Sequence, residues 1–321
     1  MTHVHLLQDF DADTIAELQR QLDPRLHFTY GEDLPPTVEI LIAGRPTADQ
    51  LNACPHLRAL VIPWAGVPDT TQDLLRRYPH VTVHNLHHNA AATAEMAVAL
   101  LLAAAKFIVP IDQRLRAHDW TPRYEPARSI GLHGKTALII GYGQIGRRVG
   151  RVCHALEMTV IATRRDRVEG DAYAEVHRNT DLPHLLPRAD ILIITAPLTP
   201  ETKGLIGEKE IALLPRGSIL INVGRGAIVD EAALYFALKS GQLAAAGLDV
   251  WYVYPTDEAS RTHTPPSKYP FHELTNVVLS PHRGGDEVGI DTARMRQLAE
   301  LLNAAARGEP LPNRVNIDAG Y

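Results

Sequence analysis

The sequence predicts an α/β protein of two domains, each built around a parallel sheet. Its 321 residues are enough for two domains of ordinary size, and a hydrophobic content of 45% is enough to fill their cores. Short β-rich runs alternate with helical patterns over residues 4–83, and the alternation resumes after residue 135. Such alternation is typical of parallel α/β sheets.

The first domain is predicted to contain strands at residues 4–7, 38–43, 57–62 and 81–83 and a helix at residues 13–22. The third strand runs into a turn between two prolines, formed by Trp64, Ala65, Gly66 and Val67. A turn at the carboxyl edge of a strand is where open α/β sheets bind ligands. It is therefore either a ligand-binding turn or an ordinary loop.

A long, mostly buried helix is predicted at residues 90–108, which are dense in Ala and Leu. We expect Pro110 to end it. Residues 112–130 are polar, rich in Arg and interrupted by Pro122 and Pro126. They are predicted to be a linker or an arm that reaches a partner subunit.

The second domain opens with GKTALIIGYGQIGR, an apolar run that ends at Ile140 and breaks into a glycine-rich turn and a helical pattern. Gly141, Gly143 and Gly146 form G-x-G-x-x-G. In a dinucleotide site these glycines allow the turn, the approach of a pyrophosphate and close packing of helix on strand. The start of the helix offers free N–H groups and a positive dipole end to phosphates.

Cofactor choice is predicted from the end of the next strand, at residues 159–163. Dinucleotide sites that take NAD usually carry an acid there, which accepts hydrogen bonds from the ribose 2′-OH. This chain has Arg164 followed by Arg165. Because guanidinium groups bind phosphate bidentately, NADP is favoured over NAD. The alternative is a solvated basic turn, from Arg164 to Arg167, that contacts nothing.

Composition excludes several classes of protein. The 32 basic and 37 acidic residues give a net charge of −5, which argues against a nucleic-acid partner. Cys54 and Cys153 have no metal-ligand spacing, and the three histidines at 84, 87 and 88 lack a neighbouring Cys or carboxylate, so we expect no metal. The longest apolar stretch, residues 96–105, is too short to span a membrane. The chain shows no secretory signal pattern at its start, and we expect a cytoplasmic protein.

Chemically useful residues follow the later predicted strands, at residues 189–195, 218–223, 244–250 and 276–280. They are Thr195 to Pro197, Asn222 to Gly226, Asp249, and Ser280 to His282. In a parallel sheet these ends gather at one edge, beside the glycine-rich turn. The long loop at residues 251–271 separates the last two; long loops of this kind are usually functional or mobile.

With these motifs in view, the chain resembles the D-2-hydroxyacid dehydrogenase family of NAD(P)-dependent oxidoreductases. The motifs are GKTALIIGYGQIGR, TAPLTPETKGLIGEKEIALLPRGSILINVGRGAIVDEAAL, GLDVW and NVVLSPHRGG, in family order. The resemblance implies two Rossmann-like or flavodoxin-like domains with a cleft between them. Residues 1–105 and 288–321 would form the substrate domain, and residues 106–287 the dinucleotide domain. It also implies a homodimer joined through the dinucleotide domains.

The resemblance assigns roles to single residues. Arg225 matches the residue that binds the substrate carboxylate and polarises the carbonyl, His282 matches the general acid/base, and Asp249 the acid near the nicotinamide. Substrate is expected at Trp64, Ala65, Gly66, Val67 and Arg225. The residues expected to bind the cofactor are Gly141, Gly143, Gln144, Ile145, Gly146, Arg164, Arg165, Pro197, Thr202, Val223, Gly224, Asp249 and Gly284.

One position departs from the family. The glutamate that usually orients the catalytic histidine is replaced by Tyr254. Tyr254 either bonds His282 or packs under the long loop; otherwise Asp257 or Glu258 swings in, or the usual reaction is impaired.

The expected activity is hydride transfer between NAD(P)H and a small 2-oxo acid, as in glyoxylate or hydroxypyruvate reduction. The alternatives are a formate-type dehydrogenase that needs no proton relay and a nucleotide-sensing protein that has lost turnover.

Overall fold

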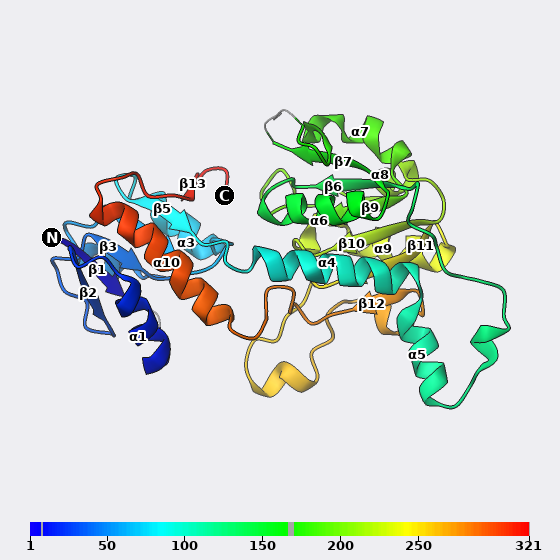
Figure 1. The fold of residues 1–321 in the computed structure, drawn as a ribbon, viewed down its shortest axis with the longest axis horizontal. Helices are drawn as coiled ribbons and strands as arrows, with labels where there is room; N and C mark the ends of the chain where they lie inside the picture. The colour runs from blue at the N-terminus through cyan, green and yellow to red at the C-terminus, as the bar shows by residue number, and fades with distance from the viewer. Residues whose placement is uncertain (8, 166–169, 321) are drawn as a thin grey trace. The chain divides into compact units, whose positions relative to one another are not determined.

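The computed structural model describes residues 1–7, 9–165 and 170–320, which form two compact units (Figure 1). Unit 1 consists of residues 1–89 and 286–321, and unit 2 of residues 90–285. The division differs from the expected one chiefly at residues 90–105, which belong to unit 2. Arg167, part of the basic turn considered above, lies outside the described residues.

Unit 1 contains a six-stranded sheet. Its order is β13-β5-β4-β3-β1-β2, and only β13 runs antiparallel to its neighbour. The five parallel strands have the flavodoxin-like order, whose direction of winding reverses between β1 and β3. The strands are β1 (Thr2–Leu6), β2 (Leu26–Tyr30), β3 (Ile40–Ile42), β4 (Ala59–Ile62), β5 (Thr82–Asn85) and β13 (Arg314–Val315).

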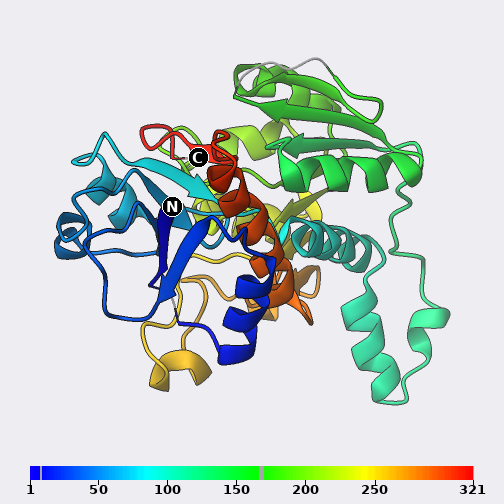
Figure 2. The same cartoon turned by 60° about the vertical axis from the view of Figure 1, so that its left-hand side comes forward.

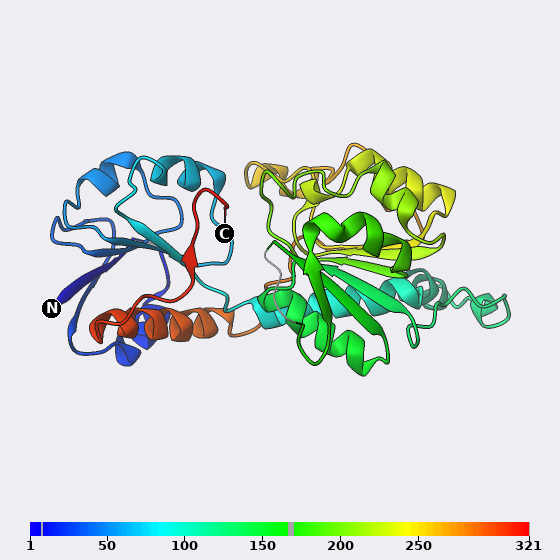
Figure 3. The same ribbon diagram turned by 90° about the horizontal axis from the view of Figure 1, so that it is seen from above.

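Helices cover both faces of this sheet, as Figure 3 shows. Helices α1 (Ala12–Gln21) and α10 (Ile290–Ala306) pack on one face, and α2 (Ala48–Asn52) and α3 (Asp69–Leu75) on the other. The start of α1 is fixed by Asp11, whose carboxylate accepts a hydrogen bond from the N–H of Thr14. Thr47 and Gln50 form a capping box at α2.

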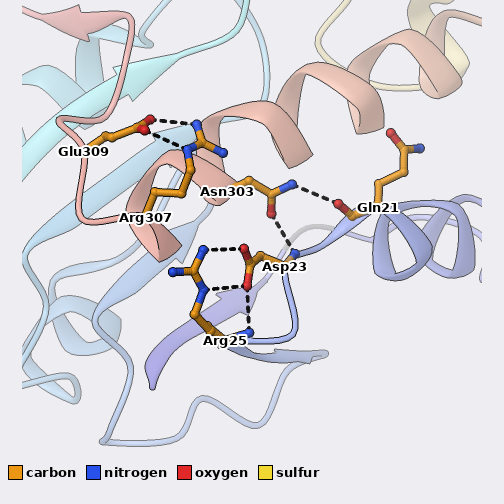
Figure 4. Close-up of polar contacts among 6 residues, drawn as sticks. All are labelled: Gln21, Asp23, Arg25, Asn303, Arg307 and Glu309. Atoms are coloured by element: carbon orange, nitrogen blue, oxygen red, sulfur yellow. Dashed lines mark hydrogen bonds and ion pairs between the residues drawn. The ribbon is translucent and has the colours of Figure 1, made fainter.

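The C-terminal helix α10 is held to the N-terminal part of unit 1 by one carboxamide (Figure 4). The side chain of Asn303 donates to the carbonyl of Gln21 (2.9 Å) and accepts from the N–H of Asp23 (2.8 Å). Asp23 in turn pairs bidentately with Arg25. These bonds, with the packing of α1 on α10, join segments about 280 positions apart into one unit.

Unit 2 contains a seven-stranded, fully parallel sheet. Its order is β12-β11-β10-β9-β6-β7-β8, which is the Rossmann order with the reversal between β6 and β9. The predicted fold class is therefore confirmed for both units. The strands are β6 (Thr136–Ile140), β7 (Thr159–Arg164), β8 (Glu175–Arg178), β9 (Ile191–Ile194), β10 (Ser218–Asn222), β11 (Leu243–Leu248) and β12 (Val277–Leu279).

The sheet of unit 2 is also covered on both faces. Helices α4 (Ala90–Ala105) and α6 (Gln144–Ala155) share one core with it. Helices α7 (Leu182–Leu185), α8 (Glu208–Leu213) and α9 (Glu231–Ser240) share the other. Because both faces are buried, central strands such as β9 are apolar throughout.

The prediction that Pro110 ends the long helix was wrong. The break comes earlier, at Phe107, whose φ of 53° is left-handed, and a second helix, α5 (Ile108–Arg116), follows. Pro110 lies in the first turn of α5, where a backbone N–H has no helical acceptor and a proline is tolerated. Part of the predicted linker is thus helical. Figure 2 shows α5 and the short 3-10 helix η1 (Thr121–Arg123) projecting from the rest of their unit.

Among the described residues, no single helix is long and apolar enough to cross a membrane. Helices α4 and α5, bent by 67° at the break, satisfy the length and composition criteria only as a pair.

Candidate active site

The glycine-rich turn joins β6 to α6 at the reversal point of the unit 2 sheet. Gly141 adopts a φ of 95°, and a Cβ there would lie 2.6 Å from the backbone of Ala196. A Cβ at Gly146 would lie 2.4 Å from the carbonyl oxygen of Gly141. Only glycine fits at either position, for the turn and for helix packing respectively.

Gly143 has the opposite surroundings. A Cβ there would meet nothing within 4 Å, and no side chain caps the start of α6 at Gln144 and Ile145. Open space at an uncapped helix start suits an anion, because the free N–H groups and the helix dipole favour negative charge. The geometry of the turn therefore suits the pyrophosphate of a dinucleotide.

Arg164 is the last residue of β7 and Arg165 follows it, both partly buried. The N–H groups of Gly141 and Tyr142 donate to the carbonyl of Thr163 at 2.9 and 3.0 Å. The arginine pair therefore begins directly beside the glycine-rich turn. This is the place that the fingerprint gives to the adenosine ribose.

Residues after β9 form a rigid loop. The hydroxyl of Thr202 donates to the carbonyl of Pro197 (2.7 Å) and accepts from the N–H of Thr199 (2.8 Å). Thr202 is 5% exposed, and its hydroxyl is used in hydrogen bonds within this loop. Pro197 is exposed at the surface of the loop.

The turn after β10 presents Arg225. Asn222, which is buried, accepts from the N–H of Gly224 and donates to the carbonyl of Arg225, both at 3.0 Å. A Cβ at Gly226 would lie 2.3 Å from the carbonyl oxygen of Trp251. The backbone is thus fixed on both sides, while the Arg225 side chain is exposed, and it donates to the Gly224 carbonyl (2.7 Å). Val223, just before it, is buried.

Asp249, at the end of β11, holds the turn that carries His282. Its carboxylate accepts from the hydroxyl of Ser280 (2.5 Å) and from the N–H groups of Arg283 (2.9 Å) and Gly284 (2.8 Å). Asp249 is 1% exposed, and a Cβ at Gly284 would lie 2.6 Å from its Oδ2. His282, within this turn, is exposed and has a left-handed φ of 60°. The buried carboxylate of Asp249 therefore keeps the backbone of His282 in an uncommon conformation.

Tyr254 lies beside His282 without bonding it. The two ring centroids are 5.5 Å apart at an interplanar angle of 55°. The phenol oxygen instead accepts from the N–H of Trp251 (3.0 Å), and the indole N–H of Trp251 donates to the Ser280 carbonyl (2.8 Å). The hydrogen bond to His282 that the sequence allowed is replaced by ring contact.

The two acidic residues of the long loop are engaged elsewhere. Asp257 accepts from the N–H of Ser260 (2.8 Å), and Glu258 pairs with Arg261 (2.9 Å). Neither carboxylate supplies the charge that the family places beside the histidine.

The electrostatics at His282 follow from these neighbours. Partial withdrawal of the ring from water and the Arg225 cation lower the pKa of His282 below its ordinary value of 6.5, and Asp249 opposes them in part. Burial raises the pKa of Tyr254, so this phenol is neutral near pH 7. The charges that act on the pKa of the imidazole are therefore the Arg225 cation and the Asp249 anion, and the Tyr254 ring beside it is neutral.

The predicted substrate turn lies in unit 1, after β4. Asn85 donates to the carbonyl of Ala65 (2.6 Å), and Gln72 donates to that of Val67 (3.0 Å). In the part of unit 1 that the structure describes, the N–H groups of residues 65–67 donate to no protein acceptor. The partly buried indole of Trp64 occupies the space that a Cβ on Gly44 would take. Fixed carbonyls and free N–H groups suit a turn that binds an anion.

Among the side chains that the structure describes, no three His, Cys, Asp or Glu residues converge to hold a metal ion. His84, for example, is buried and bonded to the carbonyl of Pro312 (2.8 Å).

Sequence reasoning missed the residues that support the site. Asn222, Trp251 and Ser280 each fix a turn through a side chain, and none was proposed to do so. Ser280 and Trp251 lie within the motifs that carry the resemblance. Their hydrogen-bond partners, however, can be identified only once β11 is known to pair with β12.

These features define a class. A Rossmann sheet with an open glycine-rich turn is a dinucleotide-binding domain, and an arginine and a histidine follow β10 and β12, the two strands on either side of β11. The family model for the D-isomer specific 2-hydroxyacid dehydrogenase, NAD binding domain, matches residues 98–284. The chain is 36% identical over 284 residues to a glyoxylate reductase of Aeropyrum pernix, covering 86% of this chain and 81% of that protein.

Two further relatives agree. A D-3-phosphoglycerate dehydrogenase of Mycobacterium leprae is 32% identical over 96% of this chain, which spans only 57% of that longer protein. The crystal structure of a D-isomer specific 2-hydroxyacid dehydrogenase from Xanthobacter autotrophicus Py2, in complex with NADPH and MES, superposes with a TM-score of 0.81 at 25% identity, covering 100% and 99% of the two chains.

The chain belongs to the D-isomer specific 2-hydroxyacid dehydrogenase family. It is an enzyme that uses a nicotinamide dinucleotide for hydride transfer between 2-oxo acids and 2-hydroxy acids.

Proposed function

We propose that this enzyme is an NADPH-preferring reductase of small 2-oxo acids such as glyoxylate and hydroxypyruvate. The observation that carries the proposal is the placement of Arg225 and His282 after β10 and β12, on either side of β11, close enough for the Arg225 charge to lower the pKa of His282. A cation and a proton donor at one edge suit a reaction that builds negative charge on a carbonyl oxygen.

The bound nicotinamide would supply the hydride to the carbonyl carbon. Arg225 would hold the substrate carboxylate and stabilise the charge that develops on the carbonyl oxygen. His282 would donate its proton to that oxygen, and the turn at Ala65, Gly66 and Val67 would give N–H groups to the carboxylate. Asp249 would act on the reaction through the turn that it holds.

The preference for NADPH is supported by Arg164 and Arg165 at the adenosine end, where no carboxylate follows β7 directly. The preference for a small substrate is supported by relatives named glyoxylate reductase.

A formate-type reaction is the second candidate, because Tyr254 puts a neutral residue where proton-transferring relatives carry a glutamate. Initial rates with glyoxylate, hydroxypyruvate, pyruvate and phenylpyruvate, each with NADPH and NADH, test the first proposal. Reduction of NADP by formate, with no turnover of the four oxo acids, would establish the second instead.

We further propose a homodimer formed through unit 2. Helix α5 buries none of its residues, and its apolar side chains Ile108, Ile111 and Leu115 are between 42% and 51% exposed. Arg114 holds the arm together by bonding Asp119 and Glu125. An arm that is held by its own polar contacts and exposes an apolar stripe is suited to binding a partner subunit.

The location that we propose is the cytoplasm. The buried free thiols of Cys54 and Cys153 support a reducing, cytoplasmic location.

Cofactor preference is tested by Arg164→Asp. Losing one charge-assisted contact should lower kcat/KM for NADPH by about tenfold to a hundredfold and leave or improve that for NADH. Arg178→Asp is the matched control, because Arg178 lies opposite Arg164 in the register of β7 with β8 and carries the same charge. A parent enzyme that prefers NADH would contradict the proposal outright.

The role of Arg225 is tested by Arg225→Lys. Lysine keeps the charge but loses the planar fork, so kcat should fall together with a rise in KM for the oxo acid. The Kd for NADPH, measured by fluorescence titration, should not change. Near-parent kinetics would remove Arg225 from the mechanism.

Tyr254→Glu tests the electrostatics at His282. Reduction needs the protonated imidazole, whose pKa is lowered, so the parent kcat/KM should fall as pH rises through a value below 6.5. A carboxylate at residue 254 favours the imidazolium and should move this fall upward by about one unit if it lies within roughly 4–6 Å of the ring.

Tyr254→Phe, which keeps the ring, is the control for the pH profiles. A parent profile that holds into alkaline pH would contradict the neutral-tyrosine account.

The dimer is tested by Leu115→Glu. Light scattering should give the parent a mass near twice 35.3 kDa and give the variant a mass near 35.3 kDa, because a buried charge opposes association. Tyr30→Glu, at an exposed apolar residue of unit 1, is the control and should stay dimeric. A monomeric parent would refute the arrangement.

A further inference from the structure

Tyr142, between the first two glycines of the fingerprint, has a role that the proposed reaction does not explain. Its side chain is 2% exposed, and its hydroxyl donates to both carboxylate oxygens of Asp171, at 3.0 Å each. A Cβ on Gly150 of α6 would lie 3.0 Å from the ring, so that glycine makes room for the phenol. A tyrosine enclosed in this way is held in one position.

Asp171 belongs to the chain segment that returns to β8. It accepts from the N–H groups of Tyr173 (2.9 Å) and Ala174 (3.1 Å), and it forms a β-bridge with Ala174. Tyr173 lies against α6, with the Arg151 guanidinium 5.9 Å from its ring and the His154 ring at 5.6 Å. The returning segment is therefore fastened to the helix of the fingerprint.

The end of β7 is held by the same residue. The backbone N–H of Tyr142 donates to the carbonyl of Thr163, which directly precedes Arg164. Tyr142 thus binds the end of β7 through its backbone and Asp171, before β8, through its phenol. Arg164 and Arg165 begin the connection between these two points.

We propose that Tyr142 and Asp171 are positioning residues that hold Arg164 and Arg165 at the adenosine 2′ position of the dinucleotide. The inference rests on the proposed preference for NADPH. Neither residue would touch the cofactor's 2′-phosphate; the bond between them would limit the positions open to the arginines. Losing the bond should then weaken recognition of the 2′-phosphate and leave the rest of the dinucleotide site unchanged.

The test measures binding of two fragments, adenosine 2′,5′-bisphosphate and 5′-AMP, by calorimetry. The parent should bind the bisphosphate more tightly. Tyr142→Phe removes only the hydroxyl, and Asp171→Asn keeps the shape of the acceptor. Each should reduce the bisphosphate-to-AMP affinity ratio by about twofold to tenfold, the effect of one hydrogen bond, with AMP affinity unchanged. In steady-state assays, KM for NADPH should rise, and kcat at saturating NADPH should stay unchanged.

Tyr78→Phe is the matched control, because it removes a phenol hydrogen bond to Asn52 (2.9 Å) in unit 1. It should leave the affinity ratio unchanged. An unchanged ratio in both Tyr142→Phe and Asp171→Asn, with a parent that prefers the bisphosphate, overturns this inference and leaves the NADPH preference intact. Equal weakening of both fragments also overturns it. A parent without the preference overturns the NADPH proposal itself, and this inference with it.

Discussion

The buried carboxylate of Asp249 is the interaction on which much of the candidate site depends. A buried charge is costly unless hydrogen bonds replace its hydration, and here one hydroxyl and two backbone N–H groups do so. All three donors lie on the turn after β12, so satisfying the carboxylate also fixes that turn. His282 occupies a left-handed conformation within it, which costs a non-glycine residue ~1–3 kcal/mol. The buried carboxylate therefore fixes the backbone of His282 and the direction in which its side chain leaves the chain.

Close backbone contacts impose a comparable constraint at the cofactor end. The turn after β6 passes so near Ala196 that Gly141 can carry no side chain, and Gly224 is equally close to the carbonyl of Ala196. The first contact occurs where the winding of the sheet reverses, between the loops after β6 and β9, and the second joins the loops after β9 and β10. A Cβ on Gly143, between these contacts and the start of α6, would meet nothing within 4 Å. The dinucleotide site thus depends on strand order and on the absence of side chains at Gly141, Gly143 and Gly224.

The sequence predicts most of this arrangement, because buried parallel strands are apolar runs and their ends carry the chemistry. It fails where tertiary contacts decide. Strand β2 (LHFTY) and β8 (EVHR) are edge strands with polar residues and give no apolar run. Helix α5 contains Pro110 and has no buried face, so neither its periodicity nor its start could be read from the sequence. The Tyr254 hydroxyl has a backbone partner, the N–H of Trp251, that no spacing rule identifies.

In the proposed reaction, Tyr254 in the place of the family's glutamate changes how substrate binding is coupled to the protonation of His282. In the proposed roles, Arg225 both binds the substrate carboxylate and lowers the pKa of His282. A bound carboxylate neutralises that cation at close range, so it removes one of the causes that lower the pKa. By linkage, substrate binding and protonation of His282 then favour each other. With a glutamate beside the ring, the imidazolium would be stabilised before substrate arrives. With Tyr254 in these proposed roles, the 2-oxo acid itself would supply the negative charge, so the proton donor would be prepared chiefly in the complex where it is used.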